Sequence, residues 1–274
     1  MNQKKNYEEL TIRDHYMFGK VCSDKENAQI ILNALLASHI NIVSTDIEKR
    51  LQNNNEQKCS YLDLLALDDE GTYYDGELQH KSKNPMRQTE LPKRSRYYQS
   101  VLDGAILDSG KEYNQLSKTY IIFICTFDLF GKGAYKYEIS KMCAEYPDLT
   151  YDDETRLIFF NTTASMENVP PEVANMLRYI ESGVAADDNT RKIDTAVKDA
   201  RLNEEWRSEY MLQHIHDYDM YQEGLYDGEE KIKVELEAEK ARAASIAMKL
   251  DEEKRRAEAA EARIKELEAL LETR

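Results

Sequence analysis

Three oxygen-bearing side chains in the stretch Tyr61–Gln79 are spaced so that they could hold a divalent metal ion. Glu77 and Gln79 lie two residues apart in a β-prone run, and side chains two apart share one face of a strand. Asp63 lies in the preceding apolar run and comes level with them if the two runs pair as strands. Hard cations such as Mg²⁺ or Mn²⁺ prefer oxygen ligands. The pattern therefore predicts a metal site built on Asp63 and Glu77.

An ion held there could support hydrolysis of a phosphodiester, because a hard divalent cation neutralises the phosphate and activates a water molecule. Asp63 and Glu77 would be ligands, and the carbonyl oxygen of Leu78 could be a third. Gln79 could position water, but an amide cannot act as a general base near neutral pH. The sequence therefore leaves the general base unassigned.

Two strands joined by a tight turn must position these side chains. Leucines recur through the first run, 62–67. Residues 68–71 (DDEG) are of the types that form turns, and the second run, 72–79, follows them. We interpret Glu70 and Asp75, two further acids of this stretch, as turn and surface residues. Helices are predicted near Thr11–Lys20, with Thr11 and Asp14 at the start, and at Asp24–Leu36 and Leu91–Leu107. A short strand or link is predicted around Ile40–Ile47, and a polar loop at Asn53–Asn55.

The run Tyr120–Phe127 is apolar on both faces, which suits a strand at the centre of a mixed sheet. Further strands are predicted at Tyr135–Ile139 and Arg156–Asn161, and from about Ser165 the pattern is helical. Helices are expected from Pro171 to about Ser182, over Asp187–Ala200 and over Asn203–Tyr221, with Gly224 and Gly228 interrupting the pattern. The expected fold class is α/β: a mixed central sheet flanked by helices, then an all-α region and a C-terminal coiled-coil helix.

A basic segment follows the acidic patch, although the chain as a whole has a net charge of −15. Residues 81–96 contain six Lys or Arg and a single Glu. Lys93, Arg94 and Arg96 could contact phosphates of DNA, with Gln99 adding a polar contact near the metals. The alternative is an ordinary helix surface with the neighbouring tyrosines in the core. His80, next to the motif, is interpreted as a surface residue.

The segment 229–274 shows a heptad pattern. Positions seven apart carry Leu236, Ala243, Leu250, Ala257, Ile264 and Leu271. Four residues before four of these lie Ile232, Ile246, Ala260 and Leu267, whereas Glu239 and Glu253 are defects of this seam. The pattern predicts a coiled coil that forms homo-oligomers; the alternative is a solitary solvated helix rich in ion pairs.

Composition excludes several classes of protein. No run of about 18 apolar residues is present, so we expect no membrane span. The first residues lack the apolar stretch of a secretory signal. The four cysteines are widely spaced without zinc-site spacing, which favours reduced thiols in a cytoplasmic protein.

The motifs resemble those of the PD-(D/E)XK nucleases, in the branch of recombination-promoting nucleases and transposases named Rpn. The resemblance rests on Asp14 with Phe18, LDLLALDDEG, GELQ, LPKRSRYYQSVLD and SKTYIIFICTFDLFGKG in that order, and it spans residues from about 7 to 228. It implies a restriction-endonuclease-like core at 1–165, a helical region at 166–228 and a charged coiled-coil tail at 229–274.

By that resemblance, Asp63 and Glu77 correspond to the metal-binding acids of the family, and Gln79 occupies the position of the motif lysine. Asp14 corresponds to an acid on the first helix that can complete the metal site; a plain helix-start role is the alternative. The resemblance implies a Mg²⁺-dependent DNA endonuclease linked to recombination or mobile elements. The second hypothesis is a nuclease fold that no longer cuts and binds DNA or a protein partner instead.

Overall fold

The computed structural model of the protein describes residues 5–51, 60–81 and 85–272. The predicted loop Asn53–Asn55 lies outside these residues, as do Cys59 and Lys83. Backbone packing divides the chain into a compact unit that ends at Tyr210 and a second unit that begins at Met211. The sheet and the candidate site belong to the first unit, and the two units are described separately.

The elements follow the predicted order closely. In chain order they are α1 (His15–Cys22), α2 (Lys25–Leu36), β1 (Ile42–Leu51), β2 (Ser60–Asp68), β3 (Tyr73–Gln79), α3 (Pro85–Thr89), α4 (Leu91–Ile106), β4 (Thr119–Cys125), β5 (Lys136–Ile139), β6 (Thr155–Asn161), α5 (Pro171–Ser182), α6 (Asp188–Arg201) and α7 (Glu204–Glu272), with 3-10 turns at Tyr7–Glu9 and Tyr113–Gln115. The segment expected to be a short strand or link is the longer strand β1. Asp24 caps α2 by accepting from the backbone N–H groups of Glu26 and Asn27.

The six strands form one mixed sheet in the order β1-β2-β3-β4-β6-β5. Strands β1, β2 and β3 pair antiparallel, β3, β4 and β6 pair parallel, and β5 returns antiparallel on β6. Strand β4 therefore lies inside the sheet between two parallel neighbours, as its uniformly apolar sequence predicts. The predicted mixed α/β fold is confirmed.

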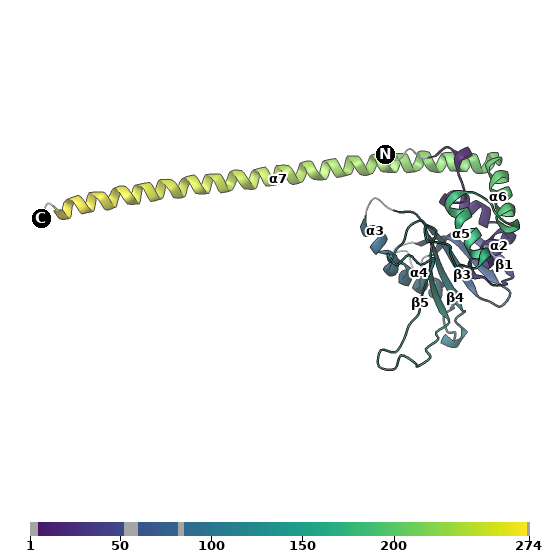
Figure 1. The fold of residues 1–274 in the computed structure, drawn as a ribbon. Coiled ribbons are helices and arrows are strands. Elements are labelled where there is room, and N and C mark those ends of the chain that lie inside the picture. Colours follow the sequence, from purple (N-terminus) through teal and green to yellow (C-terminus); the bar gives the residue numbers. More distant parts are fainter. Residues whose placement is uncertain (1–4, 52–59, 82–84, 273–274) are drawn as a thin grey trace. The chain divides into compact units, whose positions relative to one another are not determined.

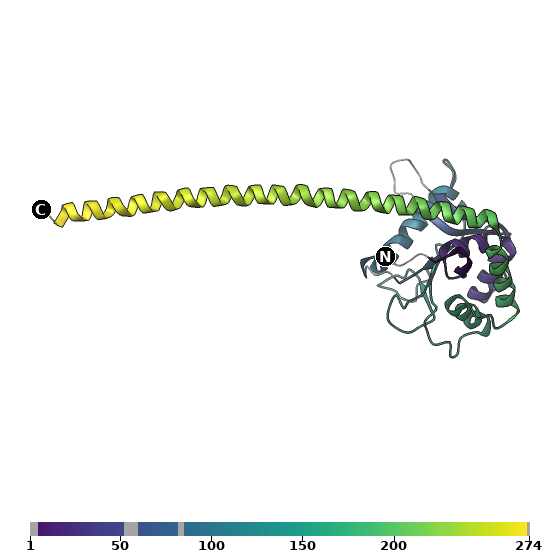
Figure 2. The ribbon, with the colours of Figure 1, turned by 90° about the horizontal axis from the view of Figure 1, so that it is seen from above.

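The two faces of the sheet are covered differently. Helices α1, α2, α5 and α6 pack together on one face and bury the larger core cluster (Figure 1). Figure 2 shows the same grouping by colour, with the purple N-terminal helices beside the green helices that follow β6. Helix α4 covers the other face with a smaller cluster that includes Phe123 and Phe159. The predicted acidic patch faces this α4 side, because Glu77 pairs with Phe123 in the β3–β4 ladder.

The β2–β3 hairpin forms around the predicted turn. Gly71 has φ +83°, a left-handed conformation that glycine adopts without strain. Asp68 stabilises the turn, since its Oδ1 accepts from the N–H groups of Glu70 and Thr72 at 3.0 and 2.8 Å. The β2–β3 ladder extends from Leu67–Tyr73 to Leu64–Gly76 and ends there. Beyond this point the two strands no longer satisfy each other's backbone groups through the ladder.

Helix α7 is continuous, so the prediction that Gly224 and Gly228 interrupt it is wrong. A glycine costs a helix about 1 kcal/mol relative to alanine, and the surrounding Glu, Lys, Arg and Ala residues offset that cost. The apolar side chains of α7 at Ile232, Leu236 and Leu250 are exposed within their own unit. No helix in the described parts of the chain combines the length and the apolar character needed to cross a membrane.

Candidate active site

Asp63 and Glu77 meet where the β2–β3 ladder ends. The backbone N–H of Asp63 donates to Oε1 of Glu77 at 2.9 Å, and the N–H of Leu78 donates to Oδ2 of Asp63 at 3.1 Å. Each carboxylate thus accepts from the backbone of the opposite strand, in place of the ladder bonds that stop at Leu64–Gly76. The structure brings the two predicted acids together on neighbouring strands.

His15 also belongs to this cluster, and sequence reasoning missed it. Its Nδ1 lies 3.0 Å from Oδ2 of Asp63. Helix α1 packs directly on β2 here: a Cβ atom at Gly19, one turn after His15, would lie 3.8 Å from the carbonyl oxygen of Asp63, in ordinary van der Waals contact. His80 is exposed, as predicted, and its ring centroid lies 5.3 Å from that of His15. No spacing rule links His15 to a residue 48 positions later.

Arg94 reaches into the site from α4. Its Nη2 donates to Oε2 of Glu77 at 2.7 Å, its Nη1 to Oε1 of Gln79 at 3.1 Å and its Nε to the hydroxyl of Tyr98 at 2.8 Å. The guanidinium carbon lies 5.0 and 5.8 Å from the ring centroids of Tyr98 and Phe123. Arg94 was predicted to contact DNA phosphates; in the structure it is bonded to Glu77 and to the motif glutamine Gln79.

The pKa of Glu77 is raised well above its usual value. Burial is the main cause, and the nearby Asp75 and Asp63 raise it further, whereas Arg94 and the Asp63 N–H lower it. Burial works against the charge of Arg94, but Tyr98 and Glu77 raise the pKa of its guanidinium above the usual value. A buried carboxylate that needs positive charge to ionise is a group that a cation would stabilise.

The prediction that Asp75 is a surface acid is wrong, because its side chain is fully buried. It lies in the middle of β3, where its neighbours in the sheet are Leu65 and Ile121. Within the parts of the chain that the structure describes, neither of its carboxylate oxygens has a hydrogen-bond partner. Burial raises the pKa of Asp75 well above its usual value, and Asp63 adds to the effect while Arg94 opposes it. By contrast, Glu70 is exposed in the turn, as predicted.

Asp14 lies directly before α1, and its carboxylate bonds to its own end of the chain. Its Oδ2 accepts from the N–H of Thr11 at 2.8 Å, the hydroxyl of Thr11 at 3.1 Å and Nζ of Lys5 at 3.0 Å. The bond from the Thr11 N–H to Asp14 is the acidic half of the predicted capping box, but α1 begins only at His15 with Asp14 in the N-cap position, so Thr11 does not cap the helix. No hydrogen bond joins Asp14 to Asp63 or Glu77 among the contacts of the described residues.

The other predicted residues of α4 form no hydrogen bond or ion pair with Asp63 or Glu77 among the contacts of the described residues. Lys93 and Arg96 are exposed. Gln99 donates through Nε2 to Oδ1 of Asp103 at 2.7 Å and is 2.8 Å from the hydroxyl of Thr119, at the start of β4. Thr119 lies four residues before the ladder partner of Glu77, so the contacts of Gln99 are roughly 13 Å along the strand from that position.

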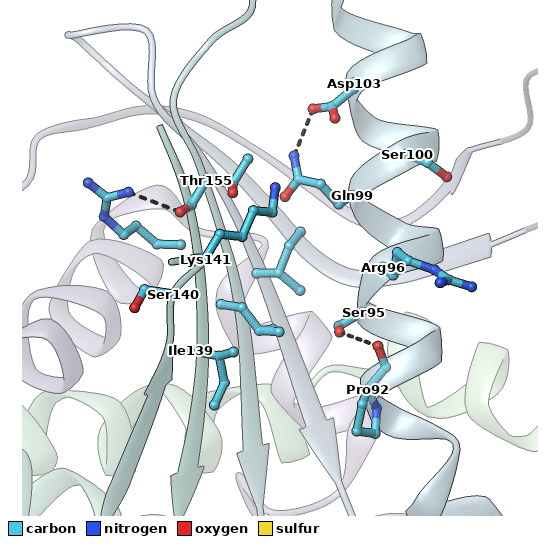
Figure 3. A pocket seen from close by; sticks show the side chains of 13 residues that line it. Pro92, Ser95, Arg96, Gln99, Ser100, Asp103, Ile139, Ser140, Lys141 and Thr155 are labelled. Atoms are coloured by element: carbon cyan, nitrogen blue, oxygen red, sulfur yellow. Dashed lines mark hydrogen bonds between the residues drawn. The ribbon is translucent and has the colours of Figure 1, made fainter. Parts of the chain in front are cut away.

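Gln99 instead lines a separate cavity of about 380 Å³ between α4 and the sheet. Figure 3 shows Lys141 and Thr155 across this cavity from Gln99, while the guanidinium of Arg96 points away from the strands. Ile121 and Leu157 contribute an apolar part of the lining. Two residues of α4 therefore contact different regions: Arg94 bonds to Glu77, whereas Gln99 lines this cavity.

The oxygen-rich donor set of the site suits a hard divalent cation. Asp63 and Glu77 supply two carboxylates, each bonded to a backbone N–H of the opposite strand, and the cationic Arg94 already bonds to one oxygen of Glu77. In the described ranges, no three side chains of His, Cys, Asp or Glu converge in an arrangement that could hold a metal ion. The site thus offers two acidic ligands, with further oxygens to come from Gln79, the backbone, water or substrate.

The structure thus gives a mixed α/β fold in which an aspartate and a glutamate are brought together at the end of a hairpin. The sequence model of the PD-(D/E)XK nuclease family transposases matches residues 13–164, more than half of the chain, and the chain belongs to this family. Membership connects it with nucleases associated with transposition, which generally use a divalent metal. No curated protein and no solved structure matches the chain.

Proposed function

We propose that the protein is a metal-dependent DNA endonuclease that acts in recombination or transposition of mobile elements. The observation that carries this proposal is the hydrogen bond from the backbone N–H of Asp63 to Oε1 of Glu77, which brings the two acids together where the β2–β3 ladder ends. The family membership supports the same activity class. Mg²⁺ or Mn²⁺ is the cofactor that fits carboxylate oxygens.

Asp63 and Glu77 would hold the metal in this proposal, with Asp14 the less supported third acid because its carboxylate is already bonded elsewhere. The bound cation would neutralise phosphate charge and lower the pKa of a water molecule. Gln79 would orient water or substrate through its amide, since it cannot take up a proton near neutral pH. The general base therefore lies outside this glutamine.

The DNA backbone would be contacted from α4. Lys93 and Arg96 are exposed and would contact phosphates, which would position the duplex without reading its sequence. Arg94, which bonds to Oε2 of Glu77, would supply positive charge beside the two acids that hold the metal. Gln99 supports this role less, because its amide faces Asp103 and Thr119.

The alternative function is a nuclease fold that binds DNA or a protein partner without cutting. Gln79 in place of a lysine favours this alternative, as does the bond from Arg94 to the oxygen of Glu77 that could face an ion. The two functions differ in a single measurable property, the formation of a metal-dependent product.

Plasmid nicking in Mg²⁺, Mn²⁺ and EDTA tests the proposal. Asp63→Asn and Glu77→Gln should each lower Mg²⁺-dependent nicking by at least about 100-fold, because each removes a charged metal ligand. Glu70→Gln is the matched control, since Glu70 is an exposed acid of the same hairpin. Equal nicking by wild type and both site variants would exclude the assignment, and DNA binding without any product would favour the alternative.

The C-terminal segment supports a second part of the proposal, self-association through a coiled coil. Ile232, Leu236, Ile246 and Leu250 of the heptad seam are exposed on the isolated helix, as seam residues are before a partner helix covers them. Replacing Leu236 and Leu250 together by Asp should shift full-length protein to a smaller species in sedimentation velocity. Val234→Asp is the control, because Val234 is exposed but lies off the seam. The division into core, helical region and tail at 165/166 and 228/229 stays part of this proposal.

A further inference from the structure

We propose that His15 is a positioning residue of the metal site: its ring fixes the carboxylate of Asp63 so that Oδ1 is the oxygen that faces the ion. This inference rests on the proposed metal-dependent function and names a residue that the sequence did not suggest. It also assigns the contribution of the first helix to His15 in place of Asp14.

The hydrogen bonds of Asp63 distinguish its two oxygens. Oδ2 accepts from the N–H of Leu78 at 3.1 Å and lies 3.0 Å from Nδ1 of His15. A carboxylate that binds a metal ion is ionised and can only accept, so in the metal site the N–H of Nδ1 of His15 would donate a hydrogen bond to Oδ2. No hydrogen bond to Oδ1 occurs among the described residues. Oδ2 is therefore occupied by two donors, and Oδ1 is left for a cation.

Two donors from different elements prevent the carboxylate from turning. A single bond from Leu78 would allow the Asp63 side chain to rotate about its last torsion, which is broad and roughly two-fold for aspartate. The second bond, from α1, fixes the plane of the carboxylate relative to β3. Ligands held in this way bind metals more tightly, and loss of such an outer partner typically weakens affinity by about 10- to 100-fold.

The fold holds His15 in place from two sides. His15 and Gly19 are one turn apart on α1, and the backbone at Gly19 packs against the carbonyl oxygen of Asp63, so the helix that carries His15 rests directly on β2. The ring of His80 packs edge-on against that of His15, with centroids 5.3 Å apart and an interplanar angle of 73°. The imidazole is thus confined by a helix and by the residue that follows the motif glutamine.

Asp14 is placed to support this arrangement from the chain that leads into the helix. Three donors from Lys5 and Thr11 converge on its Oδ2, which fixes the chain just before His15. Asp14, Asp63 and Glu77 do not form a converging set of ligands in the described part of the chain. Asp14 therefore orders the start of α1, and His15 makes the contact with the site.

Mn²⁺ binding to full-length protein without DNA tests the inference, with free Mn²⁺ measured by electron paramagnetic resonance. His15→Ala should weaken Mn²⁺ binding by about 10-fold or more. His15→Asn should restore most of the affinity, because its amide N–H can lie close to the position of Nδ1. His15→Gln should not, because its amide lies near the position of Nε2. In an Asp63→Ala background, His15→Ala should have no further effect.

The outcomes separate this inference from the proposed function. If wild type binds no Mn²⁺ that depends on Asp63, the metal site itself is refuted, and the inference with it. If wild type binds and Asp63→Ala does not, but His15→Ala binds as wild type, only the positioning role is overturned. Because His15 is half exposed, folding is checked by circular dichroism; should His15→Ala unfold, equal affinity of the Asn and Gln variants would overturn the role.

Discussion

Strand β3 presents two buried carboxylates on one face, Asp75 in its middle and Glu77 near its end, and their surroundings are opposite. Glu77 has donors from a backbone N–H, Arg94 and, at 3.5 Å, the Gln79 amide. Asp75 has no hydrogen-bond partner in the described residues. Burial raises the pKa of both. Burial is therefore common to the two positions, and only the supply of donors distinguishes them.

The difference follows from where the sheet opens. At Glu77 the β2–β3 ladder has ended, so the N–H of Asp63 is free to meet a carboxylate. At Asp75 the ladder is intact on both sides, through Leu65 and Ile121, and the backbone groups are already engaged. An acid within the continuous ladder, such as Asp75, lowers the stability of the fold. An acid two residues further along the strand, such as Glu77, finds hydrogen-bond donors.

Asp152 completes the comparison, because it has as many donors as Glu77 but is exposed. Its oxygens accept from both Nη atoms of Arg156 at 2.9 and 3.0 Å and from the N–H of Glu154 at 2.9 Å. These bonds lower the pKa of Asp152 to about 2, with the Arg156 hydrogen bond as the main cause. The three acids thus separate the effect of donors from that of burial.

The largest effect is expected on removing the cationic donor of Glu77. Arg94→Ala should lower metal-dependent nicking by about 100- to 1,000-fold, the usual loss for one electrostatic group at a reacting centre. Mn²⁺ binding without DNA should be unchanged or tighter, since the ion then meets no competing guanidinium at Glu77. Arg94→Lys should recover little, because one ammonium cannot reproduce bonds to Glu77, Gln79 and Tyr98 together.

Lys93→Ala is the matched control for Arg94, as it removes a neighbouring exposed cation of the same helix. Its effect should be a few-fold loss of DNA affinity that shrinks at high salt. If Arg94→Ala and Lys93→Ala lowered nicking equally, the bond to Glu77 would have no special role.

An intermediate effect, of opposite sign, is expected at Asp75. Asp75→Asn should raise the free energy of unfolding by about 1–3 kcal/mol at pH 8 in EDTA, because it removes a buried acid that lacks partners. The amide keeps the shape of the side chain and gains donors beside Asp63. Urea unfolding followed by circular dichroism measures the change. Glu77→Gln, which loses the partner of Arg94, should destabilise under the same conditions.

The pH dependence of stability gives the same contrast. A carboxyl whose folded pKa is raised stabilises fully below its unfolded pKa, about 4, and loses that contribution as pH rises through the folded pKa. Wild type should therefore become less stable from about pH 5 to pH 8, and Asp75→Asn should lose less over that range. Parallel curves for the two proteins would show that Asp75 ionises without penalty in the folded state.

The sequence predicts much of this arrangement because local patterns specify it. Leucine spacing, the DDEG turn and the alternation at Glu77 and Gln79 were sufficient to place the hairpin and to pair Asp63 with Glu77. The same alternation puts Asp75 on the face of Glu77, a signal that the surface interpretation overlooked. Burial of that face depends on α4, which packs over it from later in the chain.

Contacts over long sequence separations could not be predicted in this way. The bond between His15 and Asp63 depends on how closely α1 approaches β2, and Arg94 depends on the register of α4 against β3. The prediction that Gly224 and Gly228 interrupt α7 failed for a different reason. There the preference of a long run of helix-forming residues outweighs two local breakers.

The smallest effect is expected at Asp152, despite its strongly lowered pKa. Asp152→Asn should leave the unfolding midpoint at pH 7 unchanged within about 1 °C, because water and salt screen an exposed pair and its side chains lose entropy on pairing. A lowered folded pKa stabilises above the unfolded pKa and loses that contribution as pH falls, so any difference should disappear toward pH 2. Thermal unfolding at pH 7 and pH 3 measures both. A loss at pH 7 as large as the gain at Asp75 would mean that donors, and not burial, determine what a carboxylate contributes in this fold.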